Sequence, residues 1–275
     1  MSHFKFKLGF VGAGNMAEAI ARGAVGRHVL PADSIAASDP SEARRAVFDA
    51  MGVTTFERAE DIIASSEQVL LAVKPQVFPQ LGDVMSALDR ERQVVISIMA
   101  GITIASIEAA TGGPTRAIRV MPNTPLMVGK GMSGIAVGEH AGDTDETLCV
   151  HVLRGCGDVA KVTEADLDAV TAISGSGPAY LFLLAEAMQA AAIDMGLLGC
   201  HQLFVNQTIA GAAEMLMASL DTIDSPEDLR RKVTSPGGTT QAAIEHFQSH
   251  GFEQLVKDAI AAARDRSIEL GKADA

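Results

Sequence analysis

The sequence predicts an α/β fold, in which a Rossmann-type, doubly wound parallel sheet is followed by an all-helical domain. Short apolar strands alternate with helices through the first half of the chain, which is typical of a parallel sheet covered on both faces. After about Thr163 the strand-like runs disappear and helix formers dominate. We therefore divide the chain into residues 1–162, with the sheet, and residues 163–275, all helical.

The first half contains an ordered series of predicted strands and helices. Phe6–Val11 is an apolar strand that leads through a glycine turn into an amphipathic helix over Met16–Val25. The strand Ser34–Ser38 precedes a helix that Ser41 is expected to cap and that runs to about Met51. The later strands are Gln68–Val73, Gln93–Ile98, Thr115–Met121 and Gly134–Val137, with a helix over Val77–Leu88 after the first of them.

The second half is predicted to be helical over Ala169–Met195, with an interruption at Ser174–Pro178, and again over Leu203–Leu220, Gln241–His250 and Glu253–Leu270. The helix after Pro178 is rich in alanine and has few charges. Because a helix that is apolar nearly all round is buried, and a domain of about 110 residues can hardly bury it alone, we expect subunits to associate there.

Composition excludes several classes of protein. A formal charge of −12 disfavours nucleic-acid and anionic-membrane partners, which require basic surfaces. Cys149 and Cys156 flank His151, but their spacing matches no usual zinc site, so we interpret them as small buried apolar residues and predict no metal. We find no signal peptide and no apolar run near the roughly 18 residues of a membrane span. The expectation is a cytoplasmic protein.

The turn after the first strand has the pattern GxGxxA, from Gly12 to Ala17. Gly12 permits a tight turn, Gly14 lets the backbone approach a pyrophosphate, and the helix that follows offers free N–H groups. With a strand before it and a helix after it, this pattern predicts a dinucleotide site, and residues 1–162 a dinucleotide-binding domain. An ordinary glycine-rich turn is the alternative.

The second strand ends at Ser38 and Asp39, where a carboxylate would accept hydrogen bonds from the adenosine ribose and repel a 2′-phosphate. This favours NADH. Arg44 and Arg45 follow closely and would suit the phosphate of NADPH, so the choice between the two cofactors stays open. Asp39 could also serve only as a turn residue before Pro40.

Two further segments end strands at the same predicted edge of the sheet. Ala72-Val73-Lys74-Pro75 follows a buried strand, and Lys74 either faces the cofactor or is a solvated strand-end lysine. Met99-Ala100-Gly101 ends the next strand, and its small residues would let a nicotinamide ring lie close.

A second motif lies in the helical half, at Ser235-Pro236-Gly237-Gly238-Thr239-Thr240. Its glycines expose N–H groups, its hydroxyls add donors, and the helix that follows adds a positive end, so it suits a carboxylate. A chain turn with Thr239 or Thr240 as helix cap is the alternative. No lysine lies between Lys161 and Lys232, so a general acid of that type is missing from this region.

With these motifs in place, the whole chain resembles the pyrroline-5-carboxylate reductase family. The resemblance rests on Gly12–Met16, Ala72–Pro75, Arg119–Pro125, Ser174–Tyr180 and Leu229–Ile244. It implies reduction of 1-pyrroline-5-carboxylate to L-proline with NADPH or NADH, the last step of proline biosynthesis. It also implies a homodimer, in some members assembled further, with interleaved helical domains that provide dimerisation and substrate binding. This chain has Ala59 where many members carry a polar residue, and Lys232 where some carry Asn.

Site roles follow from the resemblance position by position. Thr240 would face the ring nitrogen as the catalytic residue, and Glu164, Ser235, Gly238 and Thr239 would bind the substrate with it. The cofactor would be lined by Val11, Gly12, Ala13, Gly14, Asn15, Met16, Ser38, Asp39, Ala72, Val73, Lys74, Pro75, Ile98, Met99 and Ala100. The rivals are a hydroxyacid dehydrogenase-like oxidoreductase, disfavoured by the missing lysine, and a non-catalytic NAD(P)-binding regulatory protein, which would not need a second anion loop.

Overall fold

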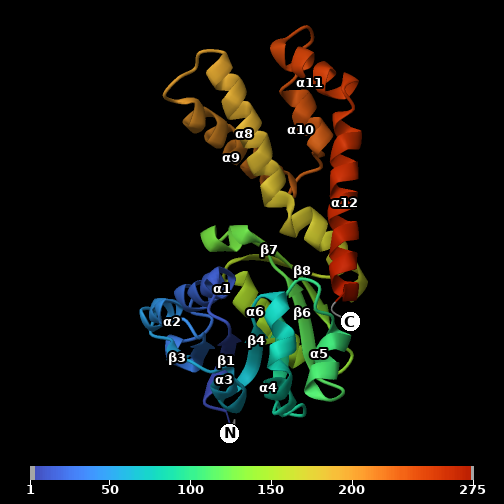
Figure 1. Ribbon diagram of the computed structural model, residues 1–275. Helices are drawn as coiled ribbons and strands as arrows, with labels where there is room; N and C mark the ends of the chain where they lie inside the picture. The colour runs from blue at the N-terminus through green and yellow to red at the C-terminus, as the bar shows by residue number, and fades with distance from the viewer. Residues whose placement is uncertain (1–3, 274–275) are drawn as a thin grey trace. The chain divides into compact units, whose positions relative to one another are not determined.

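The computed structural model describes residues 4–273, and Figure 1 shows its helices and strands. The described chain divides into two compact units, Met1–Ser176 with Ala263–Ala275, and Gly177–Ala262. The last strand ends at Lys161 and helical turns begin at Glu164. The division predicted after residue 162 lies at this change from strand to helix. The boundary between the two compact units lies instead at Gly177.

The first unit contains an eight-stranded sheet, as far as the described residues go, in the order β3-β2-β1-β4-β5-β6-β7-β8. The strands are β1 (Phe6–Val11), β2 (Ile35–Ser38), β3 (Thr54–Phe56), β4 (Ser66–Leu71), β5 (Val94–Ser97), β6 (Ala117–Met121), β7 (Gly131–Val137) and β8 (Gly157–Lys161). The first six strands in the chain pair in parallel, in the doubly wound order 3-2-1-4-5-6. The predicted doubly wound fold is confirmed.

The sheet is not parallel throughout. β7 runs antiparallel to β6, and β8 is parallel to β7. Only the short helical turn η3 (Thr124–Val128) and its flanking residues join β6 to β7. A connection of this length can return the chain antiparallel but is too short for the crossover that a parallel pair needs.

Helices cover both faces of the sheet and bury a separate apolar core on each (Figure 1). One core joins the sheet to α1 (Asn15–Gly26), α2 (Glu42–Asp49) and α6 (Asp143–Arg154). The other joins it to α3 (Ala59–Ser65), η2 (Pro75–Leu81), α4 (Gly82–Ser86) and α5 (Ile104–Thr111). Leu70 belongs to the first core and its neighbours Val69 and Leu71 to the second, so β4 is covered on both faces, as its apolar run predicts.

Some predicted elements differ in detail. The helix expected over Val77–Leu88 is a 3₁₀ segment, η2, followed by the short helix α4, because Pro79 within η2 cannot donate to a continuous α-helix. Ser41 stands at the N-cap of α2 as predicted, but among the described residues its side chain makes no capping hydrogen bond. Its backbone N–H instead donates to Oδ1 of Asp39 at 2.9 Å. β3, α3, α5, α6, β8 and α10 (Pro226–Lys232) were not predicted.

The interruption expected at Ser174–Pro178 is a change of helical winding. The turn η4 (Glu164–Asp166) leads into α7 (Leu167–Val170), the π-helical turn η5 (Thr171–Gly175) and then α8 (Gly177–Asp194). Such π turns in longer helices are frequent at functional sites.

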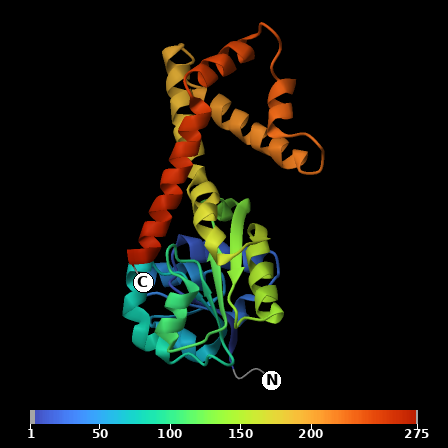
Figure 2. The ribbon, with the colours of Figure 1, turned by 90° about the vertical axis from the view of Figure 1, so that its right-hand side faces the viewer.

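The second unit is helical, as predicted. It contains α8, α9 (His201–Ser219), α10 (Pro226–Lys232), α11 (Thr239–Ser249) and the first part of α12 (Phe252–Ala273), whose length is clear in Figure 2. Of its described residues, Ala192 and Val205 are buried hydrophobic ones, whereas Phe182 is 63% and Leu183 67% exposed. This exposure of α8 in the single chain agrees with the expectation that its own domain can hardly bury it, because α8 has few neighbours within its unit.

One helical stretch, Glu164–Asp194, is long and apolar enough by length and composition to cross a membrane. This corrects the expectation that no apolar run approaches that length. The same composition occurs in helices that are covered by protein, and Glu164–Val170 already packs within the first unit, where Leu167 is 1% exposed.

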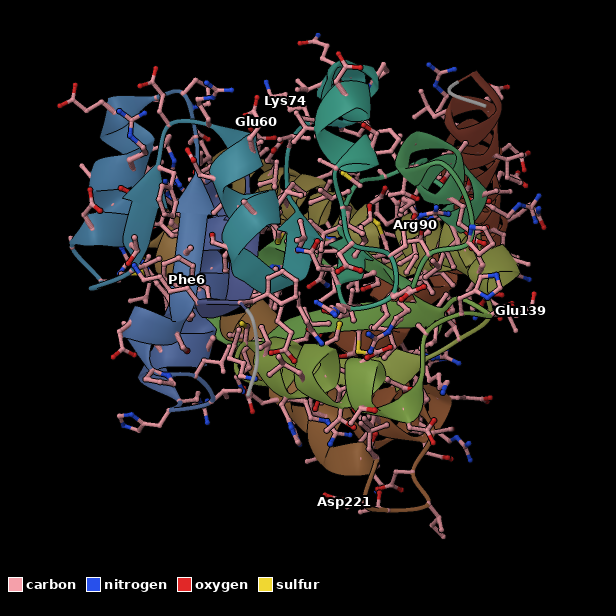
Figure 3. The ribbon with its side chains drawn as sticks, turned by 90° about the horizontal axis from the view of Figure 1, so that it is seen from below. Phe6, Glu60, Lys74, Arg90, Glu139 and Asp221 are labelled. Atoms are coloured by element: carbon pink, nitrogen blue, oxygen red, sulfur yellow. The ribbon has the colours of Figure 1, made fainter. Side chains whose placement is uncertain are left out.

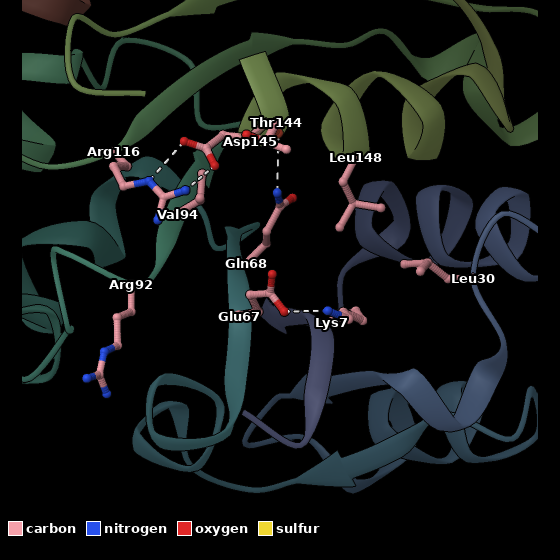
Figure 4. Close-up of a pocket in the computed structure, with 10 residues that line it drawn as sticks. All are labelled: Lys7, Leu30, Glu67, Gln68, Arg92, Val94, Arg116, Thr144, Asp145 and Leu148. Carbon is pink, nitrogen blue, oxygen red and sulfur yellow. Dashed lines mark hydrogen bonds and ion pairs between the residues drawn. The ribbon is translucent and has the colours of Figure 1, made fainter. Parts of the chain in front are cut away.

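A hollow of about 530 Å³ lies at the amino ends of β1, β4 and β5 (Figure 4). Two charged pairs lie there: Lys7 with Glu67 at 2.6 Å, and the guanidinium of Arg116 with the carboxylate of Asp145. These pairs stabilise the edge of the sheet that is opposite to the glycine turn.

Candidate active site

The carboxyl ends of the central strands lie level with one another. Val11 of β1 is in register with Ser38 of β2 and Leu71 of β4, and Leu71 is in register with Ser97 of β5. The residues that follow each strand, namely Gly12, Asp39, Ala72 and Ile98, are therefore brought to one edge of the sheet. In doubly wound folds ligands bind at this edge.

The glycine turn has the geometry of a pyrophosphate cradle. Gly12 has φ +96°, and a Cβ there would lie 2.9 Å from the backbone of Ala72 and Val73. Gly14 is the N-cap of α1, and a Cβ there would meet no heavy atom of the described residues within 4 Å. Gly12 is thus required by the fold, whereas Gly14 leaves open space at the start of a helix, where an anion is favoured.

Asp39 is fixed beside this turn. Its Oδ2 accepts a hydrogen bond from the backbone N–H of Ala13 at 2.9 Å, and its Oδ1 accepts one from Ser41. The side chain therefore shapes the turn, as the simpler alternative expected, and also keeps a carboxylate at the end of β2. Ser38 is buried, and its hydroxyl lies 3.4 Å from the carbonyl oxygen of Phe10.

The segments after β4 and β5 present backbone and small side chains at the same edge. Ala72, Val73 and Ile98 are half-buried, whereas Lys74 and Ala100 are exposed (Lys74 is labelled in Figure 3). Met99 as a whole residue is 2% exposed, and its side chain belongs to the core.

Glu164 makes structural contacts at the other end of this edge. Its Oε1 accepts from the backbone N–H of Ile104, at the start of α5, at 2.8 Å and from Nη1 of Arg119 at 3.2 Å. Arg119 lies on β6 opposite Ser97 and is 7% exposed. Sequence reasoning quoted Arg119 as part of a motif but gave it no role. An arginine within an otherwise apolar strand was the signal that a partner would be needed.

The second motif begins α11 in the second unit. Gly237 has φ +70°, and its N–H donates to Oε1 of Gln241 at 2.6 Å. Gly238 is the N-cap of α11, and a Cβ on it would lie 2.6 Å from Oγ of Ser235. Ser235 and Thr239 are exposed and Thr240 is half-buried. Thr239 and Thr240 are the first residues of the helix, so the expected alternative in which one of them is the cap is wrong.

Two of the three cysteines, Cys149 and Cys156, are unsuited to chemistry. Burial raises the pKa of the Cys149 thiol to about 12 and that of the Cys156 thiol to about 11. Both are 1–2% exposed, so their interpretation as small buried apolar residues is confirmed.

Comparisons with known proteins show which family has this architecture. The model for pyrroline-5-carboxylate reductase dimerisation matches residues 164–270, and one described as NADP oxidoreductase, coenzyme F420-dependent, matches residues 7–101. The chain is 39% identical to the pyrroline-5-carboxylate reductase of Pseudomonas aeruginosa over 269 residues, and this match covers 97% of each protein. The chain belongs to the pyrroline-5-carboxylate reductase family.

Solved structures of this family have the same fold. The pyrroline-5-carboxylate reductase of Coxiella burnetii superposes with a TM-score of 0.86 at 35% identity, over 97% of this chain and 98% of that one. The Plasmodium falciparum pyrroline carboxylate reductase, solved with NADP bound, gives a TM-score of 0.83 at 28% identity, over 98% and 99% of the two chains.

Proposed function

We propose that this protein is a pyrroline-5-carboxylate reductase that reduces 1-pyrroline-5-carboxylate to L-proline with NADPH or NADH. The observation that carries the proposal is near full-length similarity to reductases of that name, together with a glycine turn whose geometry fits a pyrophosphate. The bound cofactor supplies the hydride. Residues 1–162 are the proposed dinucleotide-binding domain, and residues 163–275 the dimerisation and substrate domain.

The cofactor-binding residues are proposed from the edge where the strands end. Gly12, Ala13 and Gly14 form the turn, and Asn15 and Met16 begin the helix, whose N-terminus favours a phosphate. Ser38 and Asp39 would face the adenosine ribose. The remaining contacts are Val11, Ala72–Pro75 and Ile98–Ala100, at the ends of β1, β4 and β5.

The substrate carboxylate is proposed to bind at the start of α11. Gly238 and Thr239 offer backbone N–H groups there, and Ser235 and Thr240 offer hydroxyls, while the helix end provides partial positive charge. Thr240 would hydrogen-bond the ring nitrogen and orient it. Glu164 is proposed to lie near the substrate in addition to its contact with Arg119.

The chemistry requires positioning more than strong acid catalysis. A protonated imine accepts hydride more readily than a neutral one, so a hydroxyl that orients the nitrogen is sufficient. Addition of hydride to the imine carbon turns the iminium into an uncharged amine, which protonates to give proline. This agrees with the lack of lysine between Lys161 and Lys232.

The active protein is proposed to be a homodimer in the cytoplasm, with no nucleic-acid or membrane partner. The dimerisation model covers α8 and α9, whose apolar side chains are exposed in the single chain. A second copy would cover them.

The direct test is an assay of cofactor oxidation with pyrroline-5-carboxylate, run in parallel with NADH and NADPH. Oxidation is expected only when the imine is present. Absence of turnover with both cofactors, from protein shown to be folded by circular dichroism, would contradict the proposal.

A further inference from the structure

The carboxyl end of β2 carries charges that favour different cofactors. The carboxylate of Asp39 suits the ribose hydroxyls of NADH, whereas Arg44 and Arg45 would suit the 2′-phosphate of NADPH. Sequence alone left the choice open. The hydrogen bonds of these three side chains show which charge is available at the strand end.

The carboxylate of Asp39 is held at the end of β2. Two backbone N–H groups, from Ala13 on one side and Ser41 on the other, fix its two oxygens at 2.9 Å each. The side chain therefore stays beside the glycine turn. A carboxylate oxygen has more than one lone pair, so both oxygens keep capacity to accept from ribose hydroxyls.

The arginines are directed to protein acceptors. Nε of Arg44 donates to the carbonyl oxygen of Ala13 at 2.6 Å, and its Nη2 donates to Oε2 of Glu18 at 2.9 Å. Nη1 of Arg45 donates to the carbonyl oxygens of Asp39 and Pro40 at 2.7 and 3.0 Å. Both guanidinium groups thus have defined positions set by the protein itself.

Glu18 on α1 holds Arg44 in place. The pair is partly buried, with the two side chains 23% and 29% exposed, and Arg22 binds the other oxygen of Glu18 at 2.9 Å. Burial opposes ionisation of this carboxyl, but hydrogen bonds from Arg22 and Arg44 outweigh it and hold the pKa of Glu18 below its ordinary value. Glu18 is therefore charged at neutral pH.

We propose that Glu18 is a specificity residue that keeps Arg44 on the glycine turn, so that Asp39 dominates the ribose site and the protein selects NADH over NADPH. This rests on the proposed function, since it assumes a nicotinamide cofactor at the glycine turn. The relative solved with NADP bound is 28% identical, so its cofactor does not decide the preference of this chain.

Binding of each reduced cofactor, measured by calorimetry without imine substrate, tests the proposal. Wild type is expected to bind NADH at least about tenfold more tightly than NADPH, a difference of about 1.4 kcal/mol. Asp39→Asn removes the repelling charge and should improve NADPH binding relative to NADH. Glu18→Ala frees Arg44 and should shift the ratio in the same direction, by about three- to tenfold.

A double variant separates release of Arg44 from loss of structure. In Glu18→Ala combined with Arg44→Ala the gain in NADPH binding should disappear, because the released guanidinium is the group that would hold the phosphate. Arg22→Ala is the matched local control, since it breaks the other ion pair of Glu18 and leaves Arg44 bound. Glu67→Gln, at the hollow in Figure 4, is the remote control. Both should keep the wild-type ratio.

The outcomes are distinct. Equal or tighter binding of NADPH by wild type overturns the inferred preference, and an unchanged ratio in Glu18→Ala overturns the role of Glu18. Binding of neither cofactor overturns this proposal and the proposed function together. Selective NADH binding without turnover of pyrroline-5-carboxylate would contradict the proposed function alone.

Discussion

At the scale of single residues, the two glycines of the turn are needed for different physical reasons. Gly12 is needed because of its positive φ and because the backbone of Ala72 and Val73 is too close for a Cβ. Gly14 has an extended backbone and open space beside it. The fold depends on the first glycine, and the proposed ligand depends on the second.

Substitution of each glycine by alanine should separate these effects. Gly12→Ala is expected to cost about 1–3 kcal/mol of stability, because a non-glycine residue is forced to a positive φ and displaces neighbouring backbone. Gly14→Ala should keep the wild-type melting temperature and weaken cofactor binding. Thermal melts and cofactor titration check both, and equal loss of stability in the two variants would contradict the distinction.

Two hydroxyls of the α11 loop should differ in their kinetic effect. Thr240→Ala should lower kcat about tenfold to a hundredfold, because the charge on the ring nitrogen changes during the reaction. Ser235→Ala should mainly raise KM, because the carboxylate has the same charge in ground and transition states. Steady-state kinetics over a range of pH measure this. Full kcat in Thr240→Ala would show that the proton is carried by the substrate.

The buried cysteines should be unreactive in the folded protein. Because burial raises the pKa of Cys149 to about 12 and that of Cys156 to about 11, both are thiols rather than thiolates at pH 8. A thiol reagent at pH 8 should therefore label them only after unfolding in denaturant. Mass spectrometry of labelled peptides would show the pattern, and rapid labelling of either residue in native protein would contradict it.

At the scale of elements, one carboxylate joins three of them. Glu164 in η4 binds the first N–H of α5 and the buried Arg119 of β6. The family resemblance implies a substrate role for Glu164, and its contacts show that it organises the edge of the sheet. The two roles differ in what a conservative substitution should do.

Glu164→Ala should lower stability by about 1–3 kcal/mol, because the buried guanidinium of Arg119 loses a charged acceptor. Glu164→Gln keeps an acceptor and should melt close to wild type. If Glu164 also contacts substrate, the glutamine variant should raise KM at nearly unchanged stability. Wild-type KM in folded Glu164→Gln would restrict its role to structure.

At the scale of the whole molecule, the second unit does not bury its own apolar surface. Phe182, Leu183 and Phe204 are all more than half exposed in the single chain. Exposed apolar patches of this kind mark association surfaces. The family's dimerisation region covers the same helices.

Leu183→Asp should therefore shift the protein from dimer to monomer, because a charge placed in an apolar interface must be desolvated. Light scattering after size exclusion measures the mass. Ala50→Asp adds the same charge to an exposed position of the first unit and should remain dimeric. A dimer of unchanged stability in Leu183→Asp would place the interface elsewhere.

The sequence by itself determined most of the strands and helices in their order, the glycine turn and the hydroxyl loop. Apolar runs such as Val69–Leu71 and the pattern from Gly12 to Ala17 are local, and local patterns follow from backbone sterics and the period of each element. It also predicted association at α8, since a helix that is apolar nearly all round can hardly be buried by a domain of about 110 residues alone.

Only the tertiary structure decided how distant residues pair. The reversed direction of β7, the contact of Arg119 with Glu164 and the binding of Arg44 by Glu18 join residues far apart in the chain. Each charged group had several partners of opposite charge available in the sequence. Which partner it meets depends on strand register and helix packing, and these are fixed by burial of the two cores as a whole.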